Sequence, residues 1–274
     1  MDKAGAAAVA VGAGVVNGIG YTVQRRALLQ TSTPYLRNPV WWAGFSLLLV
    51  AEGLGGVSFA VLPASVVVAL GSCSVVANVV FASCINKETL TWRTLAGTAC
   101  ILMGTVYIAI VTPPVRELDS HEYARLLTSL PSIVFHVGVL CVLYFHRYDM
   151  NLYQLAFYAA SVSSVTVVWF RPLLRVFLTQ DWDAFRTFLP YASIAIVSVT
   201  GVFAAAYIEP MGLRRFRQTE WVPVHFVACV LAFGVAAEIV YRDWIQADVD
   251  AWSVVSLVSS LTLVVWGVSL VPAA

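Results

Sequence analysis

The sequence predicts an all-α membrane protein of about nine transmembrane helices. Of its 274 residues, 60% are hydrophobic and only 11% are charged, and the mean hydropathy is +0.83. A soluble domain usually carries about 25% charged residues, so this composition argues strongly against a water-soluble fold. The formal net charge is +1 and no run of Lys or Arg is present, so we expect no nucleic acid partner.

Each predicted helix is a run of about 20 mainly apolar residues, the length that crosses about 30 Å of hydrocarbon. Charged residues, prolines and polar clusters mark the ends of the runs. The N-terminal run has a weak positive flank and no convincing cleavage site, so we interpret it as a spanning helix and not as a removed signal. The nine predicted helices cover residues 5–24, 39–61, 64–85, 92–111, 130–147, 152–171, 188–208, 220–241 and 251–271.

The loop between the fourth and fifth helices mixes charged and apolar residues over positions 115–129. This pattern fits an amphipathic helix that lies along the membrane interface. It fits a solvated loop equally well, and the sequence leaves both interpretations open.

Helices three and four resemble helices eight and nine. Each pair is joined by a short basic-acidic step, Lys87-Glu88 in the first and Arg242-Asp243 in the second, and each ends in an apolar run closed by proline. An offset of five helices inverts the second copy in the membrane, which is the architecture of many secondary transporters. We therefore expect one polytopic membrane domain, residues 1–274, with repeat one at 5–111, an unpaired helix at 130–147 and repeat two at 152–271.

The distribution of Lys and Arg predicts the orientation, because cytoplasmic loops retain the excess. Over the first four helices, five of these residues fall on one side and only Lys3 falls on the other. We expect the N-terminus outside and the C-terminus in the cytoplasm. The five residues on the side predicted to be cytoplasmic are Arg25, Arg26, Arg37, Lys87 and Arg93.

The stretch from Trp41 to Leu90 resembles helices two and three of the NIPA-type magnesium transporters, in the drug/metabolite transporter superfamily. Further similarity lies at Gly18, at the basic step Gln24-Arg25-Arg26, and in the C-terminal part of the chain. The chain departs from the family pattern at Gly55, where an asparagine is common, and around Pro210. The matching positions are Trp41-Trp42-Ala43-Gly44, Glu52, Pro63-Ala64, Leu70-Gly71, Ser74-Val75, Ala82-Ser83 and Glu88-x-Leu90.

The resemblance implies a multi-pass transporter of magnesium or a related divalent cation that works by alternating access, in the plasma membrane or an endosomal membrane. We expect the bilayer and the cation as partners, and a homodimer is one assembly that the sequence leaves open. An organic metabolite carrier of the same superfamily is the first alternative, with Trp41, Trp42, Tyr158 and Trp169 as candidate pocket residues. A non-transporting membrane scaffold is the second.

Glu52 is the main candidate ligand for a transported cation. It lies near the centre of helix two, where a charged side chain costs about 2.5–3.5 kcal/mol on insertion scales and needs a partner or a wet cavity. Carboxylate oxygens suit a hard divalent cation. The alternative is a protonated or hydrogen-bonded glutamate that holds helices together.

Asn17 in helix one and Asn78 in helix three complete the predicted metal site. With a rise of 1.5 Å per residue, both amides and Glu52 fall within roughly 10 Å of one another in depth. Hydrogen bonding between helices explains each asparagine equally well. The glycines Gly14-x-x-x-Gly18 and Gly53, Gly55 and Gly56 favour close helix packing, with carbonyls bared to an ion as the second interpretation.

No residue pattern predicts an enzyme or a cofactor. The five cysteines have no metal-ligand spacing and the four histidines form no HExxH motif. His136 and His225 fall inside predicted helices, where we expect structural roles. Mg²⁺ enters only as a transported substrate.

Overall fold

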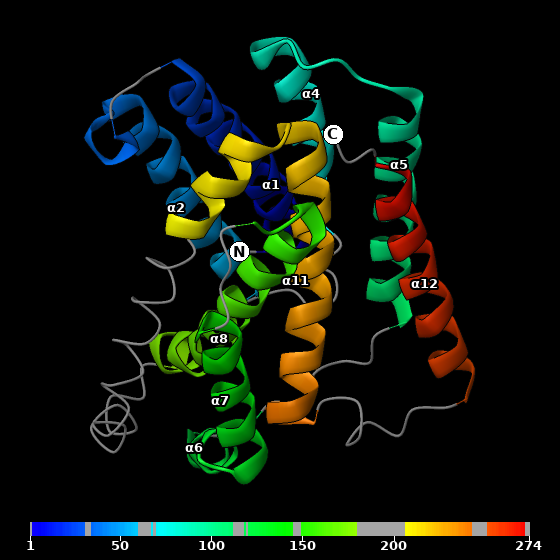
Figure 1. The fold of residues 1–274 in the computed structure, drawn as a ribbon. Coiled ribbons are helices and arrows are strands. Elements are labelled where there is room, and N and C mark those ends of the chain that lie inside the picture. The colour runs from blue at the N-terminus through cyan, green and yellow to red at the C-terminus, as the bar shows by residue number, and fades with distance from the viewer. Residues whose placement is uncertain are drawn as a thin grey trace. The chain divides into compact units, whose positions relative to one another are not determined.

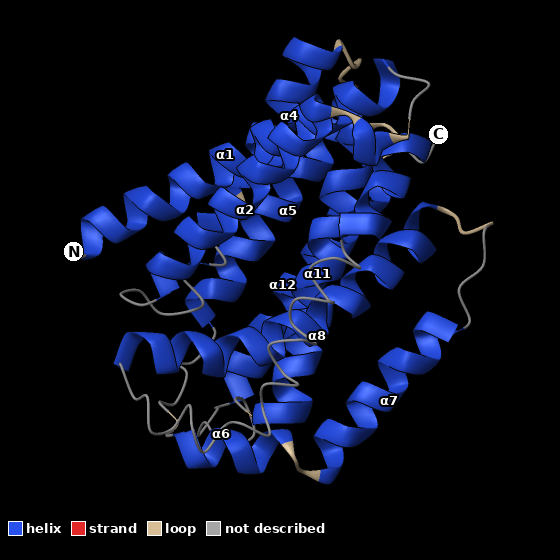
Figure 2. Cartoon of the chain, turned by 90° about the vertical axis from the view of Figure 1, so that its left-hand side faces the viewer, coloured by secondary structure: helices blue, strands red, loops and turns tan. Residues whose placement is uncertain are grey.

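The computed structural model describes the chain at residues 2–30, 34–59, 67, 70–111, 118, 120–144, 149–179, 206–242 and 251–271. All regular elements in these ranges are helical (Figure 2). They are α1 (Lys3–Gln30), η1 (Tyr35–Arg37), α2 (Pro39–Phe59), α4 (Cys73–Asn86), α5 (Trp92–Val111), α6 (Ser120–Leu127), α7 (Leu130–Tyr144), α8 (Leu152–Thr179), α11 (Gln218–Tyr241) and α12 (Ala251–Leu270). A further helical segment covers residues 206–215.

Among the described residues, four helices are long and apolar enough to cross a membrane: α1, α2, α11 and α12. The apolar helix α7 and the helix α4 are shorter than a full span within the described residues. Together with the composition, these helices identify an integral membrane protein. The predicted helix at 188–208 lies outside the described residues, except for its last three positions.

The sequence specifies where several helices begin. Asn38 stands before Pro39 and its side-chain oxygen accepts a hydrogen bond from the Val40 amide at 2.9 Å, so α2 begins with a capping asparagine and a proline. Asn151 and Gln154 bond reciprocally, with each side-chain oxygen accepting from the other residue's amide at 2.9–3.0 Å. This capping box starts α8.

Three helical segments run past their predicted ends. The prediction ends helix one at residue 24, but α1 continues through Arg25 and Arg26 to Gln30. Arg25 is only 8% exposed and is paired with Glu88, so its charge does not end the helix. Likewise α8 passes Arg171 and ends at Thr179, and the segment 206–215 passes through Pro210, although the prediction ends helix seven at residue 208.

The chain forms two compact units. The first comprises Met1–Pro114, Pro210–Val227 and Val249–Ala274, and the second comprises Val115–Glu209 and Ala228–Asp248. In the first unit α1 packs along α2 and α4, and α5 packs along α12 (Figure 1). In the second unit α7 packs on α8, and α6 contacts both of them.

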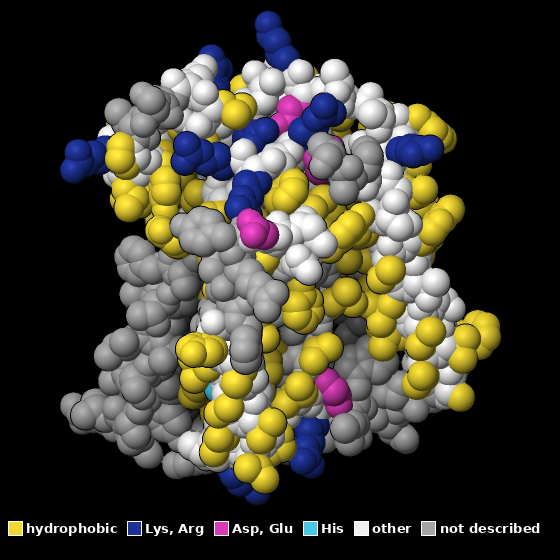
Figure 3. Space-filling model, in the orientation of Figure 1, with side chains coloured by type: hydrophobic (Ala, Val, Ile, Leu, Met, Phe, Trp, Pro, Cys, Tyr) yellow, Lys and Arg dark blue, Asp and Glu magenta, His cyan; other side chains and the backbone are white. Residues whose placement is uncertain are grey.

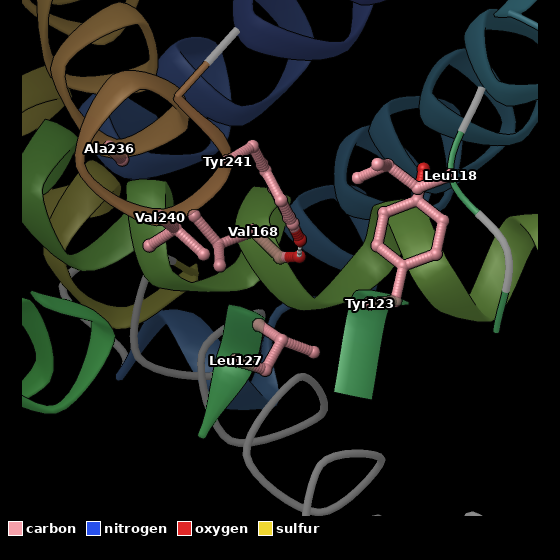
Figure 4. Packing of buried hydrophobic residues seen from close by; sticks show 7 residues of the cluster. All are labelled: Leu118, Tyr123, Leu127, Val168, Ala236, Val240 and Tyr241. Atoms are coloured by element: carbon pink, nitrogen blue, oxygen red, sulfur yellow. Dashed lines mark hydrogen bonds between the residues drawn. The ribbon is translucent and has the colours of Figure 1, made fainter. Parts of the chain in front are cut away.

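The segment before α7 contains the short helix α6, which packs against other helices of the second unit. α6 is an amphipathic helix, and its apolar side chains are buried against α8 and the second half of α11 (Figure 4). Tyr123 is 5% exposed and Leu127 is 4% exposed. Of the two interpretations left open for residues 115–129, the described part is a helix, and its apolar face contacts protein.

Candidate functional site

Backbone contacts fix the register of α1 against α2. Gly20 and Gly44 face each other so closely that a Cβ atom on Gly44 would lie 2.9 Å from the Gly20 carbonyl oxygen. Further along, the Ser58 hydroxyl donates to the Ala6 carbonyl at 3.2 Å. Since later residues of α2 meet earlier residues of α1, the two helices are antiparallel.

Glycines also bring α1 and α4 together, in a parallel arrangement. A Cβ on Gly14 would lie 3.0 Å from the Ser74 amide nitrogen, and a Cβ on Gly18 would lie 2.9 Å from the Asn78 amide nitrogen. The motif Gly14-x-x-x-Gly18 is therefore a packing surface. No described residue lies within 4 Å of a Cβ placed on Gly53 or Gly55 in α2, so the described helices give no packing contact that explains them.

These registers locate the three predicted ligands. Asn17 and Asn78 lie at nearly the same level, on adjoining helices. Glu52 is level with Gly12, five residues from Asn17, which is about 7.5 Å along the helix axis. Asn78 is fully buried and Asn17 is half-buried, while the Glu52 side chain is exposed on α2. The structure thus brings the two asparagines to one level and leaves Glu52 at the surface.

Asn78 has a partner that the sequence did not indicate, Gln218 at the start of α11. The Gln218 side-chain amide donates to the Asn78 side-chain oxygen at 2.5 Å and to the Thr22 hydroxyl at 2.7 Å. Its own oxygen accepts from the Asn86 amide at 2.8 Å. In return, the Asn78 amide donates to the Gln218 carbonyl at 3.4 Å.

The Glu88 carboxylate caps the first turn of α11. One oxygen accepts from the Gln218 backbone amide, and the other accepts from the amide and the hydroxyl of Thr219, all at 2.9 Å. A carboxylate at a helix N-terminus satisfies free amides and complements the helix dipole. We refer to Thr22, Asn78, Asn86, Glu88, Gln218 and Thr219 together as the Gln218 cluster.

Arg25 balances the charge of the cluster. Its guanidinium Nε lies 3.6 Å from a Glu88 oxygen, and the two side chains are only 10% and 8% exposed. The same guanidinium donates to the Leu213 carbonyl. The buried Glu88 carboxylate thus lies beside both a helix N-terminus and an arginine.

The end of α4 places Glu88 where it can reach α11. Lys87 adopts a left-handed conformation, with φ of 54°, and the Glu88 amide then bonds back to the Ala82 carbonyl at 3.2 Å. This is the geometry of a helix C-terminal cap, usually formed by glycine. Arg242 adopts the same conformation after α11, with φ of 55°.

Sequence reasoning singled out Lys87-Glu88 as a repeat marker and Arg25 as a family position, but it did not connect them, and it passed over Gln218. The available signal was a basic residue near the end of one helix and an acidic residue just after another, on the same predicted side. Glu220, in the first turn of α11, is also buried, at 2% exposed.

His136 and His225, which fall inside predicted helices, both contact tryptophan side chains. In the second unit, His136 accepts a hydrogen bond from the Trp169 indole at 2.8 Å, and its other ring nitrogen lies 2.6 Å from the Ser132 carbonyl oxygen. In the first unit, His225 stacks on Trp221, with ring centroids 5.2 Å apart. Within the described residues, no three His, Cys, Asp or Glu side chains come together as a metal-binding group.

The second unit also has an open hollow of about 320 Å³. Its lining is mostly apolar, with Gln154 as the one amide side chain. Tyr158, one of the four aromatic residues considered for an organic substrate, belongs to it. The lining residues are Cys141, Val142, Met150, Gln154, Phe157 and Tyr158.

Several known proteins and one protein family are similar to this chain. The family profile described as "Magnesium transporter NIPA" matches residues 6–274. The probable magnesium transporter NIPA6 of Arabidopsis thaliana is 25% identical over 242 residues, which cover 85% of this chain and 73% of that protein. NIPA1 of the same plant, also described as a probable magnesium transporter, is 25% identical over 254 residues, 89% of this chain and 70% of that protein. No solved structure matches the chain.

Proposed function

The chain belongs to the NIPA family of magnesium transporters, and on that premise we propose that it carries Mg²⁺ or a related divalent cation across a membrane by alternating access. The observation that carries the proposal is the family match along almost the whole chain. The family is one of transporters and not of enzymes. The identity of about 25% to the plant relatives leaves the ion to be tested on this chain.

We propose that the chain has nine spanning helices, arranged as two inverted repeats around an unpaired fifth helix. Two observations support the repeat. α5 and α12, which correspond in the repeat, are antiparallel, because Gly97 faces Gly267 and Gly104 faces Ser260. The predicted equivalents Lys87 and Arg242 also share one left-handed conformation just after their helices.

Glu52, Asn17 and Asn78 are the proposed ligands. Mg²⁺ prefers hard oxygen donors and keeps several of its waters, so one carboxylate and two amides in a wet path suit it. Each positive charge that enters gains about 2.3 kcal/mol per 100 mV of inside-negative potential, so a divalent cation needs no ATP site. The depths of the three residues, spread over about 7.5 Å, suit a path along which the ion moves between them.

We propose that the basic end of the first unit faces the cytoplasm, with the N-terminus outside and the C-terminus in the cytoplasm, in the plasma membrane or an endosomal membrane. Contacts of Arg25 with Glu88 and of Arg217 with Thr89 bring basic residues of several segments to one end. Lys and Arg side chains gather at this end in the space-filling view (Figure 3). An excess of such residues is typical of cytoplasmic loops.

The direct test is Mg²⁺ flux in proteoliposomes with an imposed gradient. We expect wild-type protein to carry the ion and Glu52→Gln to lower the flux at least about tenfold, because the substitution removes the only charged ligand of the proposed site. Glu122→Gln is the matched control, since it makes the same change on α6, and its flux should equal that of wild type. Equal flux for Glu52→Gln and wild type would remove Glu52 from the mechanism. No flux for wild type would overturn the ion assignment.

An organic-solute carrier is the second candidate, because the hollow of about 320 Å³ in the second unit is the size of a small-molecule pocket and is mainly apolar. Met150→Trp places a large side chain in this hollow. If the hollow binds the substrate, this variant loses uptake of organic solutes. If the substrate is Mg²⁺ bound in the first unit, Mg²⁺ flux is unchanged.

A further inference from the structure

The Gln218 cluster holds helices together through polar side chains, and such a contact between helices can open and close. It joins the first turn of α11 to α1 and to α4, at the basic end of the first unit. Polar side chains make these contacts, although the helices around them are mainly apolar. Hydrogen bonds exchange with water at a small net cost, whereas separating packed apolar surfaces in water costs free energy in proportion to their area.

The Gln218 side chain makes three hydrogen bonds in this conformation. Both hydrogens of its side-chain amide are donated, one to Thr22 and one to Asn78, and its oxygen accepts from Asn86. The Asn78 oxygen is the acceptor at 2.5 Å. This bond takes one lone pair of the Asn78 oxygen, and the whole Asn78 side chain is buried. Asn78 is therefore engaged with Gln218 when the cluster is formed.

Glu88 controls whether the cluster forms. Its two oxygens hold the first two amides of α11 and the Thr219 hydroxyl, which fixes the turn that carries Gln218. Because the cap and the amide cluster share Gln218, loss of the cap frees the side chain that occupies Asn78. The two sets of bonds act as one unit.

We propose that the Gln218 cluster is a gate that closes the transport path at the basic end, and that Gln218 withholds the Asn78 oxygen from the ion until the gate opens. The proposal rests on the proposed transport function for its role, but the gate itself is a property of the first unit and is tested without any ion. Gln218 is in this view a positioning residue, which acts on the ion through Asn78.

The test uses the accessibility of a buried position beneath the gate. Val75 lies one turn deeper than Asn78 on the same face of α4 and is 1% exposed. Val75→Cys is placed in full-length protein whose five native cysteines are replaced by alanine, and the protein is reconstituted. A membrane-impermeant thiol reagent is added on the basic side, and the rate of modification is measured. The same reagent added on the other side is the reference.

We expect slow modification when Glu88 is present and a rate at least about tenfold higher in Glu88→Gln, from the basic side only, because a neutral amide is a weaker cap. The matched control Glu122→Gln leaves the rate unchanged. Thr219→Val removes one hydroxyl hydrogen bond to the same carboxylate, and we expect it to raise the rate of modification about threefold. This variant replaces Glu88→Gln in the test if Glu88→Gln does not fold.

Hydrogen exchange of residues 217–222 separates a gate from a simple helix cap. Faster exchange in Glu88→Gln, together with an unchanged modification rate at Val75→Cys, would show that Glu88 only caps α11 and would overturn the gate. Faster modification from both sides would also overturn it, because it would report general loosening. Wild-type protein without Mg²⁺ flux would count against the proposed function alone, since neither accessibility measurement contains the ion.

Discussion

The two units of this protein hold their helices together in different ways. In the first unit, helices meet through glycines at backbone distance, as Gly18 meets Asn78 and Gly97 meets Gly267. In the second unit, bulky side chains fill the space, and Tyr241 stands edge-on to Tyr123, with ring centroids 5.7 Å apart (Figure 4). The first arrangement leaves little room for a side chain between the helices. The second gains stability from buried area and adapts more readily to substitution.

This difference fits the division of roles that we propose. Amide and carboxylate groups bind an ion only when the helices that carry them keep their spacing, and glycine contacts provide that spacing. The second unit has no such demand on its described core. The effect of one added methyl group on stability should therefore differ between a glycine at a helix contact and a glycine with space around it.

The largest expected effect is that of Gly18→Ala. The new Cβ atom would lie 2.9 Å from the Asn78 amide nitrogen and 3.0 Å from the Ala77 Cβ, and α1 would have to move away from α4. We expect a loss of about 1–3 kcal/mol in unfolding free energy, measured by thermal unfolding in detergent with a denaturant series. Gly12→Ala is the control on the same helix, since no atom of the described residues lies within 4 Å of its new atom. The comparison between the units would fail if the two variants were equally stable.

An intermediate effect is expected for Tyr241→Phe in the second unit. The Tyr241 hydroxyl donates to the Val168 carbonyl, which joins α11 to α8 in the buried cluster. Removal of the hydroxyl leaves this carbonyl without that bond, so we expect a loss of about 1 kcal/mol without a change in Mg²⁺ flux. Tyr153→Phe, at a side chain that is 44% exposed, provides the reference value. A drop in flux for Tyr241→Phe would show that this core takes part in transport.

The smallest expected effect is that of Lys87→Gly. The residue adopts φ of 54°, which glycine reaches without steric cost, so we expect the stability to change by less than about 1 kcal/mol and the cap of α11 to persist. Lys87→Val is the informative contrast, because a β-branched side chain resists this conformation. We expect it to loosen Glu88 and to raise hydrogen exchange at the start of α11. Equal exchange in both variants would remove the turn from the mechanism that positions Glu88.

Hydropathy predicted much of the helical content, because a membrane-spanning helix can be recognised from its apolar composition without knowledge of its contacts. The predicted helix at 92–111 has the same ends as α5, and that at 251–271 differs from α12 by one residue. The predicted helix ends are wrong where a charged residue has a partner that is distant in the sequence. The charge of Arg25 predicts the end of the first helix. In the structure α1 continues through Arg25, because Glu88 lies beside it and pairs with it.

The candidate site was less predictable than the fold. Glu52, Asn17 and Asn78 were selected as oxygen donors at similar depth, and their role as ligands stays a prediction. Depth along a helix follows from residue number, but the direction in which a side chain faces depends on packing. Asn78 faces a glutamine 140 positions away in the chain, and no local pattern indicates such a pair.

The Arg25 contacts also have a consequence for biosynthesis. The guanidinium bonds to the Leu213 carbonyl, 188 positions later in the chain. A ribosome that adds about 5–20 residues per second reaches that position roughly ten seconds or more after it has made α1. During this interval the guanidinium can pair with Glu88, but the Leu213 carbonyl has not yet been made. The last turns of α1 therefore acquire all of these contacts only after Leu213 has been synthesised.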